Sequence, residues 1–211
     1  MDLTSPRTIR NIQEQFGFTF KKGLGQNFLT ARNILEEIVD AAEIESGVIE
    51  VGPGFGVLTS ELAQNSDKVV TIEIDERLID VLDYTLAEYD NVKIINEDIL
   101  KLDLKKVIDD EFNGEKVSIA ANLPYYITTP IITKLLEEKL PIKNIVVMVQ
   151  KEVAERMSAK PSTKDYGAIT VLCQYYTEPS IVANVPASLF VPPPKVDSAV
   201  LKLKVLDKPS V

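Results

Sequence analysis

The chain has 211 residues, of which 45% are hydrophobic, and a formal net charge of −9; this is enough for one globular domain with a real core. It contains no apolar run near the ~20 residues that cross a bilayer, and its first residues lack the charged-then-apolar pattern of a signal peptide. It contains no histidine, which removes Ser-His-Asp catalysis and most zinc sites, so we expect no metal.

The single cysteine and the distribution of charge give two further expectations. Cys173 cannot form an internal disulfide, which fits a reducing cytoplasm, and it has no histidine to activate it as a nucleophile. Residues 1–35 carry five basic and two acidic groups, whereas the rest of the chain is strongly acidic. The net charge argues against a nucleic-acid partner, and the basic excess at the amino end softens that argument.

The first 47 residues predict two helices separated by a loop. Apolar residues recur at helical spacing over 7–16, and the stretch 18–29 contains two glycines that favour an ordered loop. Thr30 is expected to cap a helix over 31–44.

From residue 47 onward, short apolar strands alternate with amphipathic helices, a pattern typical of βαβ units and a parallel sheet. The predicted strands are 48–51, 68–74, 92–95, 116–121, 142–149, 180–185 and 198–206. The predicted helices are one through Leu58 and Leu62, then 76–88, 131–136 with a proline in its first turn, 151–159 and 166–176. A proline-rich loop, residues 191–195, separates the last two strands.

A glycine turn and two acids mark the ends of the first three strands of this alternating part. Gly52 and Gly54 follow the first strand and let a ligand approach the backbone, but their spacing differs from that of dinucleotide-binding turns. Glu73 is placed to accept hydrogen bonds from two ribose hydroxyls, and Asp98 from an adenine amine. Each feature alone also fits a turn or a helix cap. Their order at successive strand ends favours S-adenosylmethionine over NAD, although a small-molecule dehydrogenase remains an alternative.

The stretch Asn122-Leu123-Pro124-Tyr125-Tyr126 follows the strand at 116–121. The Asn122 oxygen and the Leu123 carbonyl, fixed by Pro124, can accept hydrogen bonds from an exocyclic amine, and Tyr125 offers a face for stacking a flipped base. A plain strand-to-helix turn with core tyrosines is the other interpretation.

A series of motifs then carries a resemblance to one family. They are residues 25–29, 50–59, 72–75, 96–98, 122–126, 149–156 and 190–200. In these motifs the chain resembles the ribosomal RNA adenine N6,N6-dimethyltransferases, in particular the bacterial small-subunit enzymes of the kasugamycin-sensitivity family. The resemblance implies an α/β fold of the Rossmann-like class I methyltransferase type, with a mostly parallel seven-stranded sheet and helices on both faces.

The resemblance also implies roles for individual residues. Asn27 and Leu29 would close over S-adenosylmethionine, with Gln26 nearby. Gly52 and Gly54 would lie beside its methionine part. Glu73 would bind its ribose and Asp98 its adenine. The target adenine would lie between Tyr125 and Phe190, its amine facing Asn122 and the Leu123 carbonyl. The substrate would be two adjacent adenines in the 3′-terminal hairpin of small-subunit rRNA, within an immature small subunit.

The expected organisation is a catalytic domain over residues 1–206, whose first 31 residues form a basic extension and cofactor-closing loop. Residues 207–211 would begin a linker to a helical domain that this sequence does not contain. We expect a monomer. Two other functions stay open: a large-subunit rRNA methyltransferase of the macrolide-resistance type, and a non-catalytic RNA-binding assembly factor.

Overall fold

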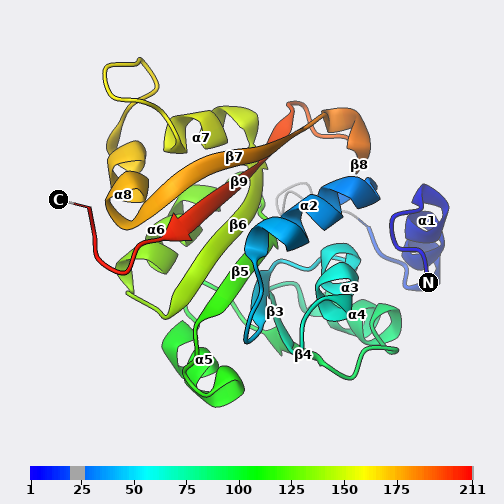
Figure 1. Ribbon diagram of the computed structural model, residues 1–211. Coiled ribbons are helices and arrows are strands. Elements are labelled where there is room, and N and C mark those ends of the chain that lie inside the picture. Colours follow the sequence, from blue (N-terminus) through cyan, green and yellow to red (C-terminus); the bar gives the residue numbers. More distant parts are fainter. Residues whose placement is uncertain (20–26, 211) are drawn as a thin grey trace.

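A computed structural model describes residues 1–19 and 27–210 (Figure 1). Its strands are β1 (Phe28–Leu29), β2 (Val48–Val51), β3 (Val69–Glu73), β4 (Val92–Asn96), β5 (Val117–Asn122), β6 (Ile142–Gln150), β7 (Thr177–Val185), β8 (Phe190–Val191) and β9 (Ser198–Val205). Its α-helices are α1 (Pro6–Gln15), α2 (Arg32–Ala42), α3 (Val57–Gln64), α4 (Ile79–Thr85), α5 (Leu104–Phe112), α6 (Thr128–Glu137), α7 (Lys151–Met157) and α8 (Ala168–Tyr176). Short 3₁₀ turns cover Glu76–Leu78 and Ala187–Leu189.

Within the described residues, one seven-stranded sheet has the strand order β4-β3-β2-β5-β6-β9-β7. The five strands from β4 to β6 are parallel, and β9 pairs antiparallel with both β6 and β7. The chain runs outward from β2 through β3 to β4 and then returns to place β5 on the other side of β2. The order therefore reverses between β2 and β5, and their carboxyl ends are where ligands bind in open α/β sheets.

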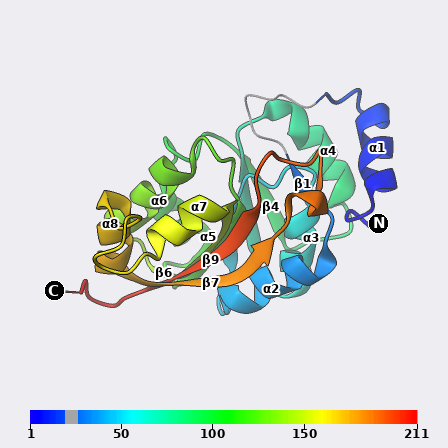
Figure 2. The ribbon, with the colours of Figure 1, turned by 90° about the horizontal axis from the view of Figure 1, so that it is seen from above.

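Alternating side chains of each central strand supply two hydrophobic layers. Val48 belongs to the cluster that contains buried residues of α2, α3 and α4, whereas Ile49 belongs to the cluster that contains buried residues of α5, α6, α7 and α8. Figure 2 shows α2 and α3 on the opposite side of the sheet from α6 and α7. The predicted fold, a mostly parallel seven-stranded sheet with helices on both faces, is confirmed.

Two helix predictions differ from the structure, one for α5 and one for the start of α2. α5 is absent from the helices predicted above, although Leu104, Val107, Ile108 and Phe112 form its buried stripe and the Asp103 carboxylate caps it by accepting from the Lys106 N–H. The predicted Thr30 cap is wrong. Thr30 lies outside α2, and both its N–H and its hydroxyl donate to the Leu189 carbonyl, at 2.9 and 2.8 Å.

A second, two-stranded sheet joins distant parts of the chain. β1 pairs antiparallel with β8, which places Phe28 opposite Val191 and Leu29 opposite Phe190. No helix within the described part of the chain combines the length and apolar character needed to cross a membrane.

Candidate functional site

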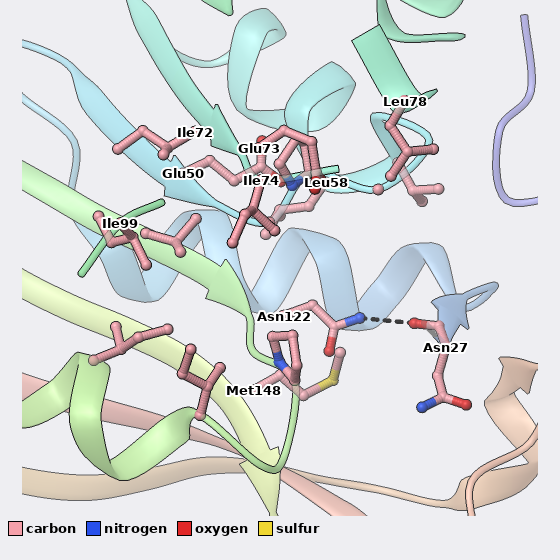
Figure 3. A pocket seen from close by; sticks show the side chains of 18 of the residues that line it. Asn27, Glu50, Leu58, Ile72, Glu73, Ile74, Leu78, Ile99, Asn122 and Met148 are labelled. Carbon is pink, nitrogen blue, oxygen red and sulfur yellow. Dashed lines mark hydrogen bonds between the residues drawn. The ribbon is translucent and has the colours of Figure 1, made fainter. Parts of the chain in front are cut away.

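A pocket opens at the carboxyl ends of β2, β3 and β5, where the strand order reverses (Figure 3). It holds about 1040 Å³ of empty space, part of which is open to solvent. Residues predicted from the sequence to bind cofactor or substrate line it: Asn27, Leu29, Gly52, Gly54, Glu73, Asp98, Asn122 and Pro124. Gln26 lies outside the described residues.

The turn after β2 has glycine at two positions of the pocket wall, Gly52 and Gly54, for two different steric reasons. Gly52 has a φ of +71°, and a Cβ there would meet no atom within 4 Å, so its backbone faces open space that a ligand can use. Gly54 has a φ of +59°, and a Cβ there would come within 2.8 Å of the Phe28 ring. Gly54 therefore allows the segment around β1 to pack directly on the turn.

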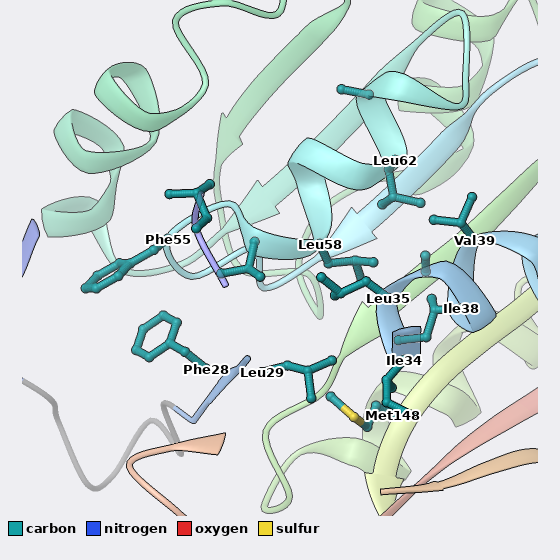
Figure 4. Packing of buried hydrophobic residues seen from close by; sticks show 14 of the residues in the cluster. Phe28, Leu29, Ile34, Leu35, Ile38, Val39, Phe55, Leu58, Leu62 and Met148 are labelled. Atoms are coloured by element: carbon teal, nitrogen blue, oxygen red, sulfur yellow. The ribbon is translucent and has the colours of Figure 1, made fainter. Parts of the chain in front are cut away.

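Aromatic packing holds that segment, and Figure 4 shows the rings of Phe28 and Phe55 facing each other. Phe28 stacks on Phe55 of the glycine turn with ring centroids 4.3 Å apart, and Phe18 meets Phe55 edge-on at 5.2 Å. The Arg77 guanidinium lies 4.8 Å from the centre of the Phe18 ring. Stacked aromatic pairs and such cation–π contacts resist displacement. Residues 27–29 are thus held at the pocket by packing with the turn and by pairing with β8.

Glu73 lies at the end of β3 with its carboxylate almost buried, at 5% exposure. Oε1 accepts the Asp75 N–H at 2.8 Å. Burial raises the pKa of Glu73 to about 7, against the lowering effect of backbone N–H groups from Asp75 and Gly54. A carboxylate with this pKa carries its charge only in part near neutrality, and a ligand that donates hydrogen bonds to it favours the ionised form.

Glu50, one position before the end of β2, is a second buried acid on the pocket wall. It is 1% exposed, and Oε2 accepts a hydrogen bond from the Thr59 hydroxyl of α3 at 2.5 Å. Burial raises its pKa to about 8, the Thr59 hydrogen bond opposes the shift, and the charge of Glu73 adds to it. At neutral pH the Glu50 carboxyl is therefore mostly uncharged.

Asp98 both caps the following turn and lines the pocket, the two roles that its place after the third strand allowed. Its Oδ1 accepts the Leu100 N–H at 3.0 Å, as a cap of the following turn, and Oδ2 lies 3.8 Å from the Lys101 ammonium. It also lines the pocket. An ionised carboxylate has about four acceptor positions, so the cap leaves others for an amine.

Asn122 is oriented by the segment at the mouth of the pocket. Its Nδ2 donates to the Asn27 carbonyl at 3.0 Å (Figure 3). With the amide nitrogen so used, Oδ1 is the acceptor that this side chain offers a ligand. Leu123 is 1% exposed, and its N–H donates to the Met148 carbonyl at 3.1 Å, which ties the turn to β6.

The two aromatic residues assigned to the target base do not line this pocket. Tyr125 is half-buried, and its hydroxyl lies 2.8 Å from the Ser198 hydroxyl oxygen. Phe190 is 2% exposed and belongs to the hydrophobic core. In this structure the Phe190 ring offers no open face, so stacking of a base on it requires local movement.

Several apolar residues of the pocket were given no role from the sequence, among them Ile74, Ile99 and Tyr126. Ile74 and Ile99 directly follow Glu73 and Asp98, and Tyr126 follows Tyr125; Ile74 and Tyr126 are 54% and 57% exposed. The charges of Asp98 and Glu73 reach the Tyr126 phenol, whose pKa is raised first by burial and then by these acids. The signal was available, because each isoleucine follows an acid at a strand end. Apolar walls beside acceptors suit a flat, nitrogen-containing ring.

Comparison with known proteins gives a consistent result. The family model described as ribosomal RNA adenine dimethylase matches residues 17–211. Ribosomal RNA small subunit methyltransferase A of Alkaliphilus oremlandii is 53% identical, over 99% of this chain and 74% of that protein.

Two solved structures share both fold and sequence. A dimethyladenosine transferase from Plasmodium falciparum superposes with a TM-score of 0.74 at 35% identity, over 85% of this chain and 64% of that one. The 23S rRNA methyltransferase ErmE gives 0.72 at 33% identity, over 87% of this chain and 72% of that one.

Proposed function

Because this chain belongs to the ribosomal RNA adenine dimethylase family, we propose that it transfers methyl groups from S-adenosylmethionine to N6 of two adjacent adenines in the 3′-terminal hairpin of small-subunit (16S) rRNA. The choice of the small subunit rests on the 53% identity to a small subunit methyltransferase over nearly the whole chain, against 33% to a 23S rRNA methyltransferase. The product is N6,N6-dimethyladenine.

The pocket fits the cofactor. Gly52 leaves backbone open to the methionine part, Glu73 can accept from ribose hydroxyls, and Asp98 can accept from the adenine amine. Ile74 and Ile99 supply apolar contact for the adenine ring. S-adenosylmethionine supplies a methyl group already activated by its sulfonium. Burial that raises the pKa of Glu73 also strengthens its interaction with a positively charged ligand once it is ionised.

The turn after β5 positions the target amine. The Asn122 Oδ1 and the Leu123 carbonyl accept the two N6 hydrogens, a geometry that releases the nitrogen lone pair from the adenine ring toward the methyl group. The Asn27 carbonyl holds the Asn122 amide in the matching orientation. Each transfer breaks the bond between the sulfonium sulfur and the methyl group, leaves S-adenosylhomocysteine, and releases one N6 proton to solvent. Positioning and electrostatics then suffice without a strong general base, which suits a chain without histidine.

Tyr125 and Phe190 complete the base site in this proposal. Tyr125 is half-buried next to Pro124 and can stack on a flipped adenine, which contributes roughly 1–3 kcal/mol per base. Phe190 contacts the opposite face of the adenine once the residues that cover its ring move aside. Two transfers to one amine require that the same site also admit the monomethylated base.

The proposed partner is rRNA within an immature small ribosomal subunit, and the protein acts as a monomer in the cytoplasm. The proposed compartment rests on cysteine usage, because the sequence contains one cysteine, Cys173, and so cannot form an internal disulfide.

The test is methyl transfer from labelled S-adenosylmethionine to small subunits from a strain that lacks the modification, with the RNA digested to nucleosides. We expect labelled N6,N6-dimethyladenosine from small subunits and none from large subunits. Label on large-subunit RNA would instead support the 23S alternative.

A non-catalytic assembly factor is the other alternative. Asn122→Ala discriminates it, because binding to the particle should persist while methylation is lost. A folded wild-type chain that binds S-adenosylmethionine and the particle but yields no methylated adenosine would refute the catalytic proposal.

A further inference from the structure

The strand β9 begins at Ser198, and its side chain reaches the turn after β5. The Ser198 hydroxyl oxygen lies 2.8 Å from the Tyr125 hydroxyl oxygen. The two residues are 73 positions apart in sequence, and Ser198 is fully buried while Tyr125 is only half-buried. The buried Ser198 hydroxyl therefore holds the hydroxyl end of the Tyr125 ring, which is still partly exposed to solvent.

Ser198 is rigidly placed by its backbone. In the sheet it lies opposite Gln150 of β6 on one side and opposite Val185 of β7 on the other. Its neighbour Asp197 is held too, because its carbonyl accepts the Lys151 N–H at 3.0 Å and its Oδ1 accepts the Ala187 N–H at 2.9 Å. The serine hydroxyl is a fixed point rather than an adaptable surface group.

The rest of the turn is held through its backbone, and these bonds do not orient the Tyr125 ring. The Pro124 carbonyl accepts from the Ile127 N–H and from the Thr128 hydroxyl, both at 3.2 Å. Rotation of the ring about its side-chain bonds is limited by packing and by the bond to Ser198. Burial raises the pKa of Tyr125, so its phenol stays protonated and can donate.

We propose that Ser198 is a positioning residue for methyl transfer, which fixes the Tyr125 ring in the orientation that stacks the target adenine. This role rests on the proposed function of Tyr125. It also gives the proline-rich loop a task, because the loop begins next to Phe190 and leads, three residues after its end, to Ser198, which anchors the opposite aromatic wall. One short segment thereby sets both sides of the base site.

The test compares Ser198→Ala, Tyr125→Phe and the double variant in single-turnover methylation of small subunits. Each single change removes one partner of the same hydrogen bond, so each should slow transfer by roughly three- to tenfold, the range for one neutral hydrogen bond. The double variant should be no slower than either single, because the bond can be lost only once. S-adenosylmethionine affinity should be unchanged, and monomethylated adenosine should accumulate because the second transfer needs the base in register again.

Two further variants separate positioning from general damage. Ser198→Thr keeps the hydroxyl and should recover most of the rate. Tyr175→Phe, the same deletion on the exposed surface of α8, should behave as wild type. If Ser198→Ala fails to fold, Tyr125→Phe alone decides the matter, since it keeps the ring and loses only the hydroxyl.

A wild-type rate in Tyr125→Phe, or additive losses in the double variant, would overturn the role of Ser198 while leaving the proposed function intact. A wild-type protein that yields no dimethyladenosine would overturn both.

Discussion

Glu50 is a carboxyl group in the core, and replacing it with glutamine tests its ionisation directly. The group is 1% exposed, its pKa is raised from 4.5 to about 8, and Thr71 lies opposite it on β3. Glutamine keeps the shape and the acceptor for the Thr59 hydroxyl. Its new N–H group can donate to the hydroxyl oxygen of Thr71, the side chain whose hydrogen bond lowers the pKa of the Glu50 carboxyl. The Glu50→Gln variant should therefore fold like wild type and differ only in lacking the ionisable group at position 50.

The direction of the effect follows from the raised pKa. The folded protein binds the Glu50 proton more tightly than the unfolded chain, so the stability that this group contributes is complete below pH 4.5 and is lost as the pH rises to about 8. Each pH unit inside that window changes the free energy of unfolding by about 1.4 kcal/mol. Between pH 6 and pH 8, wild type should lose about 2 kcal/mol relative to Glu50→Gln, an order-of-magnitude figure.

Urea unfolding followed by far-ultraviolet circular dichroism measures this difference, since the chain has no tryptophan to report by fluorescence. Glu73 also titrates in this range, and subtracting the variant from wild type removes its contribution apart from its charge interaction with Glu50. Glu36→Gln, the same change at an exposed position, is the matched control and should follow wild type. A difference between wild type and Glu50→Gln that stays constant from pH 6 to pH 8 would show that Glu50 is charged when folded, and the burial argument would be wrong.

Three further predictions concern the pocket. Asn122→Ala should abolish methylation and leave cofactor affinity within about tenfold, because it removes an acceptor for the target amine; calorimetry with a methylation assay checks both, and full activity would contradict the role. S-adenosylmethionine should bind about tenfold more weakly at pH 6 than at pH 8, because Glu73, with a pKa of about 7, loses its charge, and Glu73→Gln should bind weakly without that pH dependence. Phe28→Ala should destabilise the fold by roughly 3–5 kcal/mol, because it removes a buried ring stacked on Phe55; an unchanged midpoint in urea would refute that packing.

The features that could be predicted from the sequence are those fixed by local pattern. Alternating strands and helices gave the sheet, and the position of an acid at each strand end placed Glu73 and Asp98 at the pocket, because parallel strands end at one edge. α5 shows that even a clear local stripe can be overlooked between two strands.

The features that could not be predicted depend on contacts between distant segments. The Asn122 amide bound to the Asn27 carbonyl spans 95 positions, and the Thr30 hydroxyl bound to Leu189 spans 159. In the second case a tertiary partner replaced the cap that local chemistry favours. The burial of Phe190 likewise follows from the pairing of β1 with β8, which no periodicity in the sequence indicates.

The position of β9 has a consequence for how the protein is made. β9 lies between β6 and β7, although it follows both in sequence. Until residues 198–205 have left the ribosome, β6 exposes an unpaired edge and β7 has no neighbour, so a nascent chain carries an open template for misassociation. The same event brings Ser198 to Tyr125. Completion of the sheet and completion of the proposed base site are thus one late step in folding, and a chain arrested before that step carries the pocket without its anchored tyrosine.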